Sequence, residues 1–453
     1  MGLPHALVLP YPAQGHVIPL LELSYCLIDD DFKITFVNTE YNHKCVLANL
    51  SKKESEMKGI NLVAVPDGLD PEEDRKDLGR LNDACQKTMP TCLEELIRRT
   101  NESGDDKITC MIIDVSMAWA LEIAKKMGLR AAAFWPASAG ILAPTLSIPK
   151  LIEDGVIDPE GIPKQQMFQL DPDMPPMNSN HLVWTCFSDP ELRQKLFNYI
   201  ENTIRAIEIA EHIICNSFKE IELPAFTYAP NIIPVGPLLT GERFGKPIGH
   251  FWPEDATCMA WLDVQPANSV IYVAFGSLTI INQIQFQELA LGLELSGRTF
   301  LWVVRPDLTS ETSDAYPEGF RDRVMTKGRM VGWAPQQKVL AHPSIACFIS
   351  HCGWNSTLEG IRNGVPFLCW PYFADQFLNQ SYICDVWRIG LQMTANKSGI
   401  ITKEHIKSRV EELLGDETMR ARAIEMKEMA NRSVIKGGSS FENLKSFADA
   451  MKQ

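Results

Sequence analysis

The feature that most limits the fold of this chain is an alternation of short apolar runs with longer amphipathic segments. Segments with helical periodicity, such as 18–27 and 117–127, separate the apolar runs of the first half. Those runs are 5–10, 32–37, 108–113, 131–135 and 212–216. Strands rich in Val, Ile and Leu between helices are typical of βαβ units, in which helices cover both faces of a parallel sheet. A doubly wound α/β domain is therefore predicted.

A second series with the same alternation follows a stretch rich in proline and glycine. Residues 228–255 contain five prolines and four glycines, a composition typical of an interdomain linker. Beyond it, a helical segment at 283–296 lies among apolar runs at 269–275, 300–304, 329–331 and 347–350. We therefore predict two doubly wound Rossmann-like domains that face each other across a cleft at the carboxyl ends of their strands. The predicted boundaries are 1–235 for the first domain, 236–255 for the linker, 256–435 for the second domain and 436–453 for a C-terminal helix that packs back on the first domain.

Composition narrows the possible partners and the compartment. The net charge of −14 argues against nucleic acid and anionic membrane surfaces, which bind basic patches. The 12 cysteines include no C-x-x-C pair, which favours reduced thiols in the cytoplasm. Residues 131–149 carry no charge but contain three prolines, so we expect no membrane insertion. The expected protein is a cytoplasmic monomer.

A turn at 351–356, His-Cys-Gly-Trp-Asn-Ser, follows the apolar run 347–350 and leads into a helical segment. Gly353 lets the backbone approach a bound group, and the helix N-terminus attracts phosphate. His351, Asn355 and Ser356 add side-chain donors. The alternative is structural, because Ser356-Thr-Leu-Glu359 has the spacing of a capping box that would complete the helix start without a ligand.

This turn lies inside a segment that resembles a known signature. Residues 333–376 are similar, without a gap, to the 44-residue box of plant secondary-product glycosyltransferases, the family 1 UDP-glycosyltransferases. The resemblance implies the GT-B fold, with an N-terminal acceptor-binding domain and a C-terminal domain that binds the UDP-sugar. It implies donor contacts from Ser277, Trp333, Ala334, Gln336, His351, Gly353, Trp354, Asn355, Ser356, Glu359, Asp375 and Gln376.

The residue types fit the roles that the family gives them. Trp333 would stack on uracil, although a tryptophan beside a proline turn is as often core. Gln336 and Glu359 would bind the ribose. The adjacent acid and amide of Asp375 and Gln376 suit the vicinal hydroxyls of a hexose, and a Gln at the end of the box favours glucose.

The candidate base lies in the other half of the chain. His16 follows the first apolar run at the predicted start of a helix, where the dipole favours the neutral imidazole, and Gly15 leaves an acceptor room to approach. A lone histidine is more often a surface or core residue, and Asp114, at the end of the run 108–113, has the position of a helix N-cap. The resemblance makes His16 the general base and Asp114 the partner that orients it.

The resemblance implies a metal-independent, inverting transfer of a hexose from a UDP-sugar co-substrate, with no further cofactor. The expected acceptor is a hydroxyl of a flavonoid or other phenolic. Candidate acceptor contacts are Gly15, Met117, Trp135, Trp184 and Phe373. A terpenoid or hormone acceptor, C-glycosylation of a phenolic ring and a non-catalytic UDP-sugar-binding protein stay open as alternatives.

Two further observations qualify this interpretation. Many relatives carry Thr or Ser where this chain has Pro136, which puts one expected sugar contact in doubt. A dinucleotide-dependent oxidoreductase would need G-x-G-x-x-G at a strand–helix turn, and the sequence contains no such run.

Overall fold

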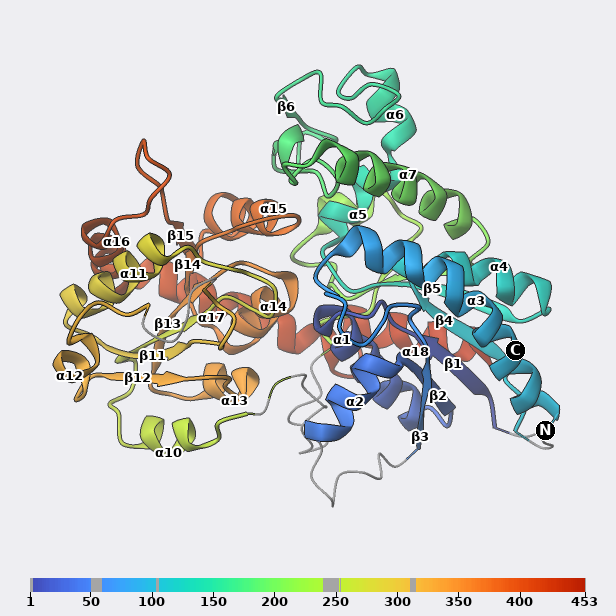
Figure 1. Cartoon of the computed structure of the whole chain (residues 1–453), viewed down its shortest axis with the longest axis horizontal. Coiled ribbons are helices and arrows are strands. Elements are labelled where there is room, and N and C mark those ends of the chain that lie inside the picture. Colours follow the sequence, from blue (N-terminus) through green and yellow to red (C-terminus); the bar gives the residue numbers. More distant parts are fainter. Residues whose placement is uncertain are drawn as a thin grey trace. The chain divides into compact units, whose positions relative to one another are not determined.

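The computed structural model describes residues 3–49, 59–102, 106–238, 252, 254–309 and 315–452. The chain forms two units, which we describe separately. Unit 1 comprises Met1–Phe251 and Arg432–Gln453, and unit 2 comprises Trp252–Asn431. Each unit is built on one parallel sheet with helices packed against it (Figure 1). The predicted linker 236–255 lies in large part outside the described residues, since 239–251 and 253 are not among them.

The sheet of unit 1 has the strand order β3-β2-β1-β4-β5-β8-β9, and all its pairings are parallel. Its strands are β1 (His5–Leu9), β2 (Lys33–Thr39), β3 (Ile60–Val65), β4 (Cys110–Asp114), β5 (Arg130–Trp135), β8 (His212–Cys215) and β9 (Ile232–Pro234). Its helices are α1 (Gln14–Asp29), α2 (Glu40–Asn49), α3 (Leu78–Glu102), η1 (Val115–Met117), α4 (Trp119–Lys126), α5 (Ala139–Leu146), α6 (Ile148–Glu153), η2 (Ser179–His181), α7 (Pro190–Ile207), α8 (Leu223–Tyr228) and α18 (Ser439–Met451). A short hairpin joins β6 (Met167–Phe168) to β7 (Met177–Asn178).

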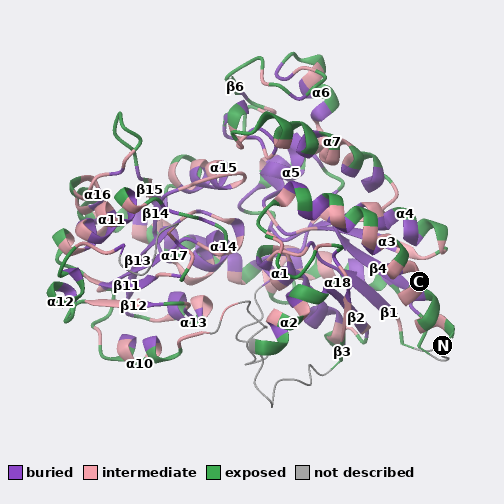
Figure 2. Ribbon diagram, in the orientation of Figure 1, coloured by how far each residue is buried: buried purple, intermediate pink, exposed green. Residues whose placement is uncertain are grey.

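Apolar side chains cover both faces of this sheet. Leu7 and Leu9 of β1 belong to one core cluster, whereas Ala6 and Val8 belong to another. Because successive side chains of a strand point to opposite faces, a strand buried on both sides must be apolar throughout. This explains the unbroken apolar runs of the sequence, and the same strands are buried in Figure 2.

The last helix of the chain packs on unit 1. Phe447, Ala448 and Met451 of α18 join the cluster that contains Val8. Asn443 Nδ2 also donates a hydrogen bond of 2.9 Å to the Pro234 carbonyl at the end of β9. The final helix therefore completes one face of the first sheet.

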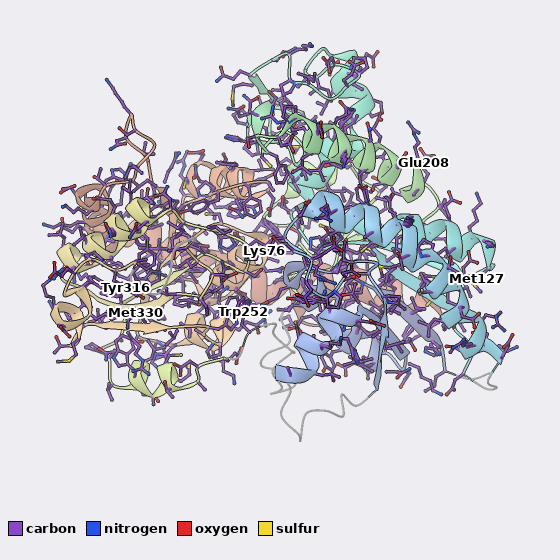
Figure 3. The ribbon with its side chains drawn as sticks, viewed as in Figure 1. Lys76, Met127, Glu208, Trp252, Tyr316 and Met330 are labelled. Atoms are coloured by element: carbon purple, nitrogen blue, oxygen red, sulfur yellow. The ribbon has the colours of Figure 1, made fainter. Side chains whose placement is uncertain are left out.

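The sheet of unit 2 has the order β12-β11-β10-β13-β14-β15 and is also parallel. Its strands are β10 (Val270–Ala274), β11 (Thr299–Val303), β12 (Gly328–Val331), β13 (Ile345–Ser350), β14 (Phe367–Cys369) and β15 (Gly390–Gln392). Its helices are α10 (Thr257–Asp263), α11 (Gln283–Ser296), α12 (Phe320–Val324), α13 (Gln336–Ala341), α14 (Trp354–Asn363), α15 (Gln376–Ser381), a π-helical turn η3 (Tyr382–Val386), α16 (Lys403–Gly415) and α17 (Glu417–Val434). Tyr316 and Met330, labelled in Figure 3, pack against a core that includes Trp302.

The observed elements follow the sequence pattern with shifts at their ends. The segment 283–296 coincides with α11, but the helix expected at 18–27 extends over α1, Gln14–Asp29. The helix expected at 117–127 is divided into η1 and α4, because Asp114 caps a separate turn by accepting a hydrogen bond from Ser116 N. The first shift matters for the site, since it places His16 inside the first turn of α1.

A buried carboxylate stabilises the start of α5. Glu222 is fully buried, and its two oxygens accept hydrogen bonds from Ala139 N at 3.0 Å and Gly140 N at 2.8 Å. The Ser217 hydroxyl donates a third at 2.5 Å. Burial raises the pKa of Glu222, while these donors and the positive end of the helix dipole favour its charge.

Replacing Glu222 with Ala should destabilise unit 1, because two buried N–H groups would lose their acceptor. We expect a loss of about 2–4 kcal/mol in the free energy of unfolding, measured by urea denaturation. The exposed Glu160→Ala variant is the matched control and should unfold at the wild-type midpoint. Equal midpoints for Glu222→Ala and wild type would contradict this role.

Candidate functional site

Each sheet reverses its strand order beside one strand, and the candidate residues lie at those two points. In unit 1, β1 lies between β2 and β4, so the chain builds outward on one side of β1 and then on the other. In unit 2, β10 lies in the same way between β11 and β13. Ligands of open α/β sheets bind at such switch points, outside the carboxyl ends of the strands.

His16 and Asp114 meet at the switch point of unit 1. His16 lies in the first turn of α1, after β1, and Asp114 is the last residue of β4. His16 Nδ1 is 2.8 Å from Asp114 Oδ2. The aspartate side chain is fully buried, whereas 27% of the histidine side chain is exposed. A carboxylate accepts from Nδ1–H, so this contact selects the tautomer in which Nε2 is the basic nitrogen.

Asp114 has both of the roles considered from the sequence. Its Oδ1 accepts a hydrogen bond of 2.8 Å from Ser116 N, which caps the η1 turn, while Oδ2 contacts His16. The two bonds hold the carboxylate in one orientation. The N-cap and the histidine partner are therefore the same residue.

Neutral aromatic groups surround this pair. The rings of Tyr11 and His16 have centroids 5.1 Å apart, and Tyr199 donates through its hydroxyl to the Ser116 carbonyl. Burial raises the pKa of both tyrosines well above the ordinary value, so both phenols are neutral near pH 7. Asp114 is thus the charge nearest to the imidazole among these groups.

At the switch point of unit 2, one imidazole is packed between two glycine backbones. A Cβ on Gly276 would lie 2.5 Å from His351 Nε2, and so would a Cβ on Gly353. Gly276 also has φ +67, a conformation that L residues with side chains rarely adopt. Both glycines are required by the close approach of the histidine ring.

The capping-box interpretation of 356–359 is wrong. The helix α14 begins at Trp354 with Gly353 as its N-cap, and no side chain caps it. Ser356 therefore lies two residues inside the helix, too far along to be the cap. Its hydroxyl and the Glu359 carboxylate instead face another residue of the signature.

That residue is Gln336, the first residue of α13. Its Nε2 donates to Ser356 Oγ at 2.8 Å and to Glu359 Oε2 at 2.6 Å. Its Oε1 accepts from the Tyr272 hydroxyl at 3.1 Å. Tyr272 was not predicted as a site residue, although a tyrosine in the otherwise aliphatic strand 270–274 could have indicated one. Three signature positions and one strand residue thus form a single hydrogen-bonded group.

A second set of hydrogen bonds holds Asp375 and Gln376, the last two residues of the signature segment 333–376. Asn379 Nδ2 donates to Asp375 Oδ2 and to the Cys352 carbonyl, both at 2.8 Å. Gln376 Oε1 accepts from the backbone N–H groups of Tyr372 and Phe373, at 2.8 and 3.2 Å. The amide oxygen of Gln376 therefore serves its own loop, and its nitrogen is the end that can meet a ligand. Asn379 was also missed; its signal is the helical i+4 spacing from Asp375.

The remaining predicted donor residues differ in exposure. Trp333 and Ser277 are half-buried, whereas Ala334 and Trp354 are buried. Asn355 is half-buried in the first turn of α14. Their side chains are therefore divided between the core of unit 2 and its surface.

The predicted acceptor contacts differ in burial and in their own hydrogen bonds. Met117 and Trp184 are buried in unit 1, and Trp184 Nε1 donates to the Gly161 carbonyl at 2.8 Å. Trp135 is half-buried and donates to the Ser138 carbonyl at 2.8 Å. Gly15 is exposed in α1. Phe373 is half-buried in unit 2.

The His351 ring is electrically neutral at ordinary pH. Burial and the neighbouring Arg305 guanidinium lower the pKa of His351 to about 4. A neutral imidazole can donate one hydrogen bond without carrying a charge.

Among the described residues, no group of three or more His, Cys, Asp or Glu could hold a metal ion. No described helix has both the length and the apolar character needed to cross a bilayer.

Known proteins are similar to this chain over nearly its whole length. The family model described as "UDP-glucoronosyl and UDP-glucosyl transferase" matches residues 248–434. UDP-glycosyltransferase 83A1 of Arabidopsis thaliana is 43% identical over 100% of this chain and 97% of its own length. The 7-deoxyloganetin glucosyltransferase of Catharanthus roseus is 32% identical, over 99% of this chain and 96% of its own length.

A solved structure is similar over the same extent. Phytolacca americana UGT2, complexed with UDP-2fluoro-glucose and pterostilbene, has a TM-score of 0.82 and 27% sequence identity. The match covers 99% of this chain and 100% of that one.

The His351 pKa predicts part of the acid sensitivity of the protein. With a folded pKa of about 4 against 6.5 in the unfolded chain, the unfolded state binds more protons between these values. The contribution of His351 to the free energy of unfolding is therefore fully present above pH 6.5 and falls as the pH is lowered toward 4. Replacing His351 with Asn should remove about 2–3 kcal/mol of the loss between pH 7 and 4.5, measured by urea denaturation at both pH values. Equal losses for variant and wild type would contradict the lowered pKa of the His351 imidazole.

Proposed function

The chain belongs to the plant family 1 UDP-glycosyltransferases, and we propose that it transfers glucose from UDP-glucose to a hydroxyl of a small lipophilic metabolite, with inversion at the anomeric carbon. It is a glycosyltransferase with the GT-B fold. The observation that carries the finer proposal is the His16–Asp114 contact, because it supplies an oriented base.

In the proposed reaction, His16 Nε2 takes the proton of the acceptor hydroxyl. The acceptor oxygen forms a bond to the anomeric carbon, and the bond from that carbon to the β-phosphate oxygen breaks, so that its electron pair leaves with UDP. Asp114 stabilises the imidazolium that forms. General-base help of this kind contributes roughly 10²–10⁴-fold to the rate. Attack opposite the leaving group converts an α-linked donor into a β-linked product.

We assign the donor to unit 2. The diphosphate would lie against the turn 351–356 and the Gly276–Ser277 turn, where the α14 dipole and a neutral His351 meet its charge. Trp333 would stack on uracil, and the Gln336–Glu359 pair would bind the ribose. The Asp375 carboxylate and the Gln376 amide nitrogen would bind hexose hydroxyls. In this proposal the fixed dipoles take the place that a metal ion has in other transferases.

The proposed acceptor is a phenolic compound such as a flavonoid. The exposed Gly15 and the half-buried Trp135 support this choice, because they offer open space and an aromatic surface in unit 1. Pterostilbene and 7-deoxyloganetin, named with two relatives, also support a small organic acceptor. Terpenoid or hormone acceptors and C-glycosylation are the alternatives that a product analysis separates.

The departure at Pro136 changes the expected sugar contacts. Ser138 is the hydroxyl residue nearest to Pro136 in the sequence. It does not replace the missing Thr or Ser, because its Oγ accepts a hydrogen bond from Ile141 N at 3.2 Å and caps α5. We therefore propose that hexose binding depends on Asp375 and Gln376 without help from this loop.

The decisive variant is His16→Ala. We expect transfer to phenolic acceptors to fall by roughly 10²–10⁴-fold, because the base is lost, while UDP binding measured by calorimetry stays within about twofold of wild type. His405→Ala, at a histidine of α16 that accepts from Thr394 N, is the matched control and should keep full turnover. Turnover in His16→Ala equal to wild type would refute the base assignment, whereas a wild-type protein that binds UDP but transfers no sugar to any acceptor would favour the alternative of a binding protein.

A further inference from the structure

A buried arginine holds the turn that follows β10. Arg305 follows β11, and only 1% of its side chain is exposed. Its Nη1 donates to the Gly276 carbonyl, and its Nη2 donates to the Thr279 carbonyl at 2.7 Å. Its Nε donates to Asp307 Oδ1 at 3.0 Å. One guanidinium therefore ties both ends of the 276–279 turn to the strand beside it.

A buried charge is a costly way to hold a loop. Burial lowers the pKa of Arg305, although an arginine stays protonated in proteins. A neutral amide could bond two carbonyls at a smaller desolvation penalty. Asp307 pairs with the charge at Nε, and the effect of the charge on the turn is exerted through the two carbonyls that Nη1 and Nη2 contact.

The direction of the Gly276–Ser277 peptide shows where that effect would fall. The peptide is trans, so its C=O and N–H groups point to opposite sides. Because the Gly276 carbonyl faces Arg305, the Ser277 N–H faces away from it. A hydrogen bond from a charged donor also polarises the peptide and makes its N–H a stronger donor. The same glycine lies against His351 Nε2, at the switch point of the sheet.

We propose that Arg305 is a positioning residue for the donor diphosphate: it fixes and polarises the Gly276–Ser277 peptide so that the Ser277 N–H binds a phosphate oxygen. This inference rests on the proposed assignment of the diphosphate to the turns at 276–277 and 351–356. Arg305 acts through the peptide and does not itself touch the ligand.

The backbone around the arginine is held independently of its side chain. The Arg305 carbonyl accepts from Leu308 N at 3.1 Å, and the Leu308 carbonyl accepts from Ile281 N at 2.8 Å. Leu308 is buried in the core of unit 2. Substitutions of the guanidinium are therefore expected to leave the fold intact and to release only the turn.

The experiment compares ligands with and without phosphate. Arg305→Met should raise the Kd for UDP by about 10–100-fold in calorimetry, the size expected for a hydrogen bond involving a charged group. The Kd for uridine, followed by ligand-detected NMR titration, should stay within about twofold. Arg305→Lys keeps the charge but cannot span both carbonyls, so its UDP affinity should lie between wild type and Arg305→Met. Arg323→Met, at a surface arginine paired with Glu294, is the matched control and should bind both ligands as wild type does.

Each result decides between defined alternatives. Unchanged UDP binding in Arg305→Met overturns the inference, and so does an equal loss for uridine and UDP, which would show a general structural role. If Arg305→Met does not fold, Arg305→Lys decides: a loss for UDP alone supports the inference, and wild-type binding overturns it. Failure of the wild-type protein to bind UDP would instead refute the proposed donor assignment.

Discussion

The reversal of strand order beside β1 and beside β10 is the constraint on which both halves of the proposed chemistry depend. In a parallel sheet all strands present their carboxyl ends at one edge, and the loops separate where the order reverses. In unit 1 this geometry brings His16 and Asp114, 98 positions apart in the sequence, into hydrogen-bond contact. In unit 2 it brings Gly276 against His351. Neither contact needs a dedicated loop, because the topology supplies it.

The donor half adds a dense set of polar contacts to this geometry. His351 fits only because two neighbouring residues lack a side chain, and burial together with Arg305 keeps its ring neutral. Gln336 joins strand β10 to helix α14 through both ends of its amide. All of these contacts are made within the protein, and dipoles fixed in this way can stabilise a departing diphosphate at low reorganisation cost.

The sequence could predict the fold, and the positions of His16 and Asp114 in it, because both rest on a pattern. Unbroken apolar runs indicate buried parallel strands, and His16 and Asp114 follow such runs at their carboxyl ends. The capping-box interpretation failed because helix α14 starts at Trp354, and a spacing of four residues does not show where a helix begins. Tyr272, Asn379 and Arg305 were not predicted. Tyr272 and Arg305 are single polar residues in or beside an apolar segment, and Gln336 and the 276–279 turn that they contact lie far away in the sequence, so only the folded backbone shows these contacts. Asn379 bonds to Asp375 at helical spacing, but its bond to the Cys352 carbonyl is likewise visible only in the fold.

The proposed reaction is a single displacement in which a base-activated hydroxyl attacks the anomeric carbon. Its most direct test is the anomeric configuration of the product, determined by NMR after incubation of the wild-type enzyme with α-linked UDP-glucose and a panel of phenolic and terpenoid alcohols. We expect a β-linked glucoside. An α-linked product would contradict it, because attack opposite the leaving group inverts the anomeric carbon.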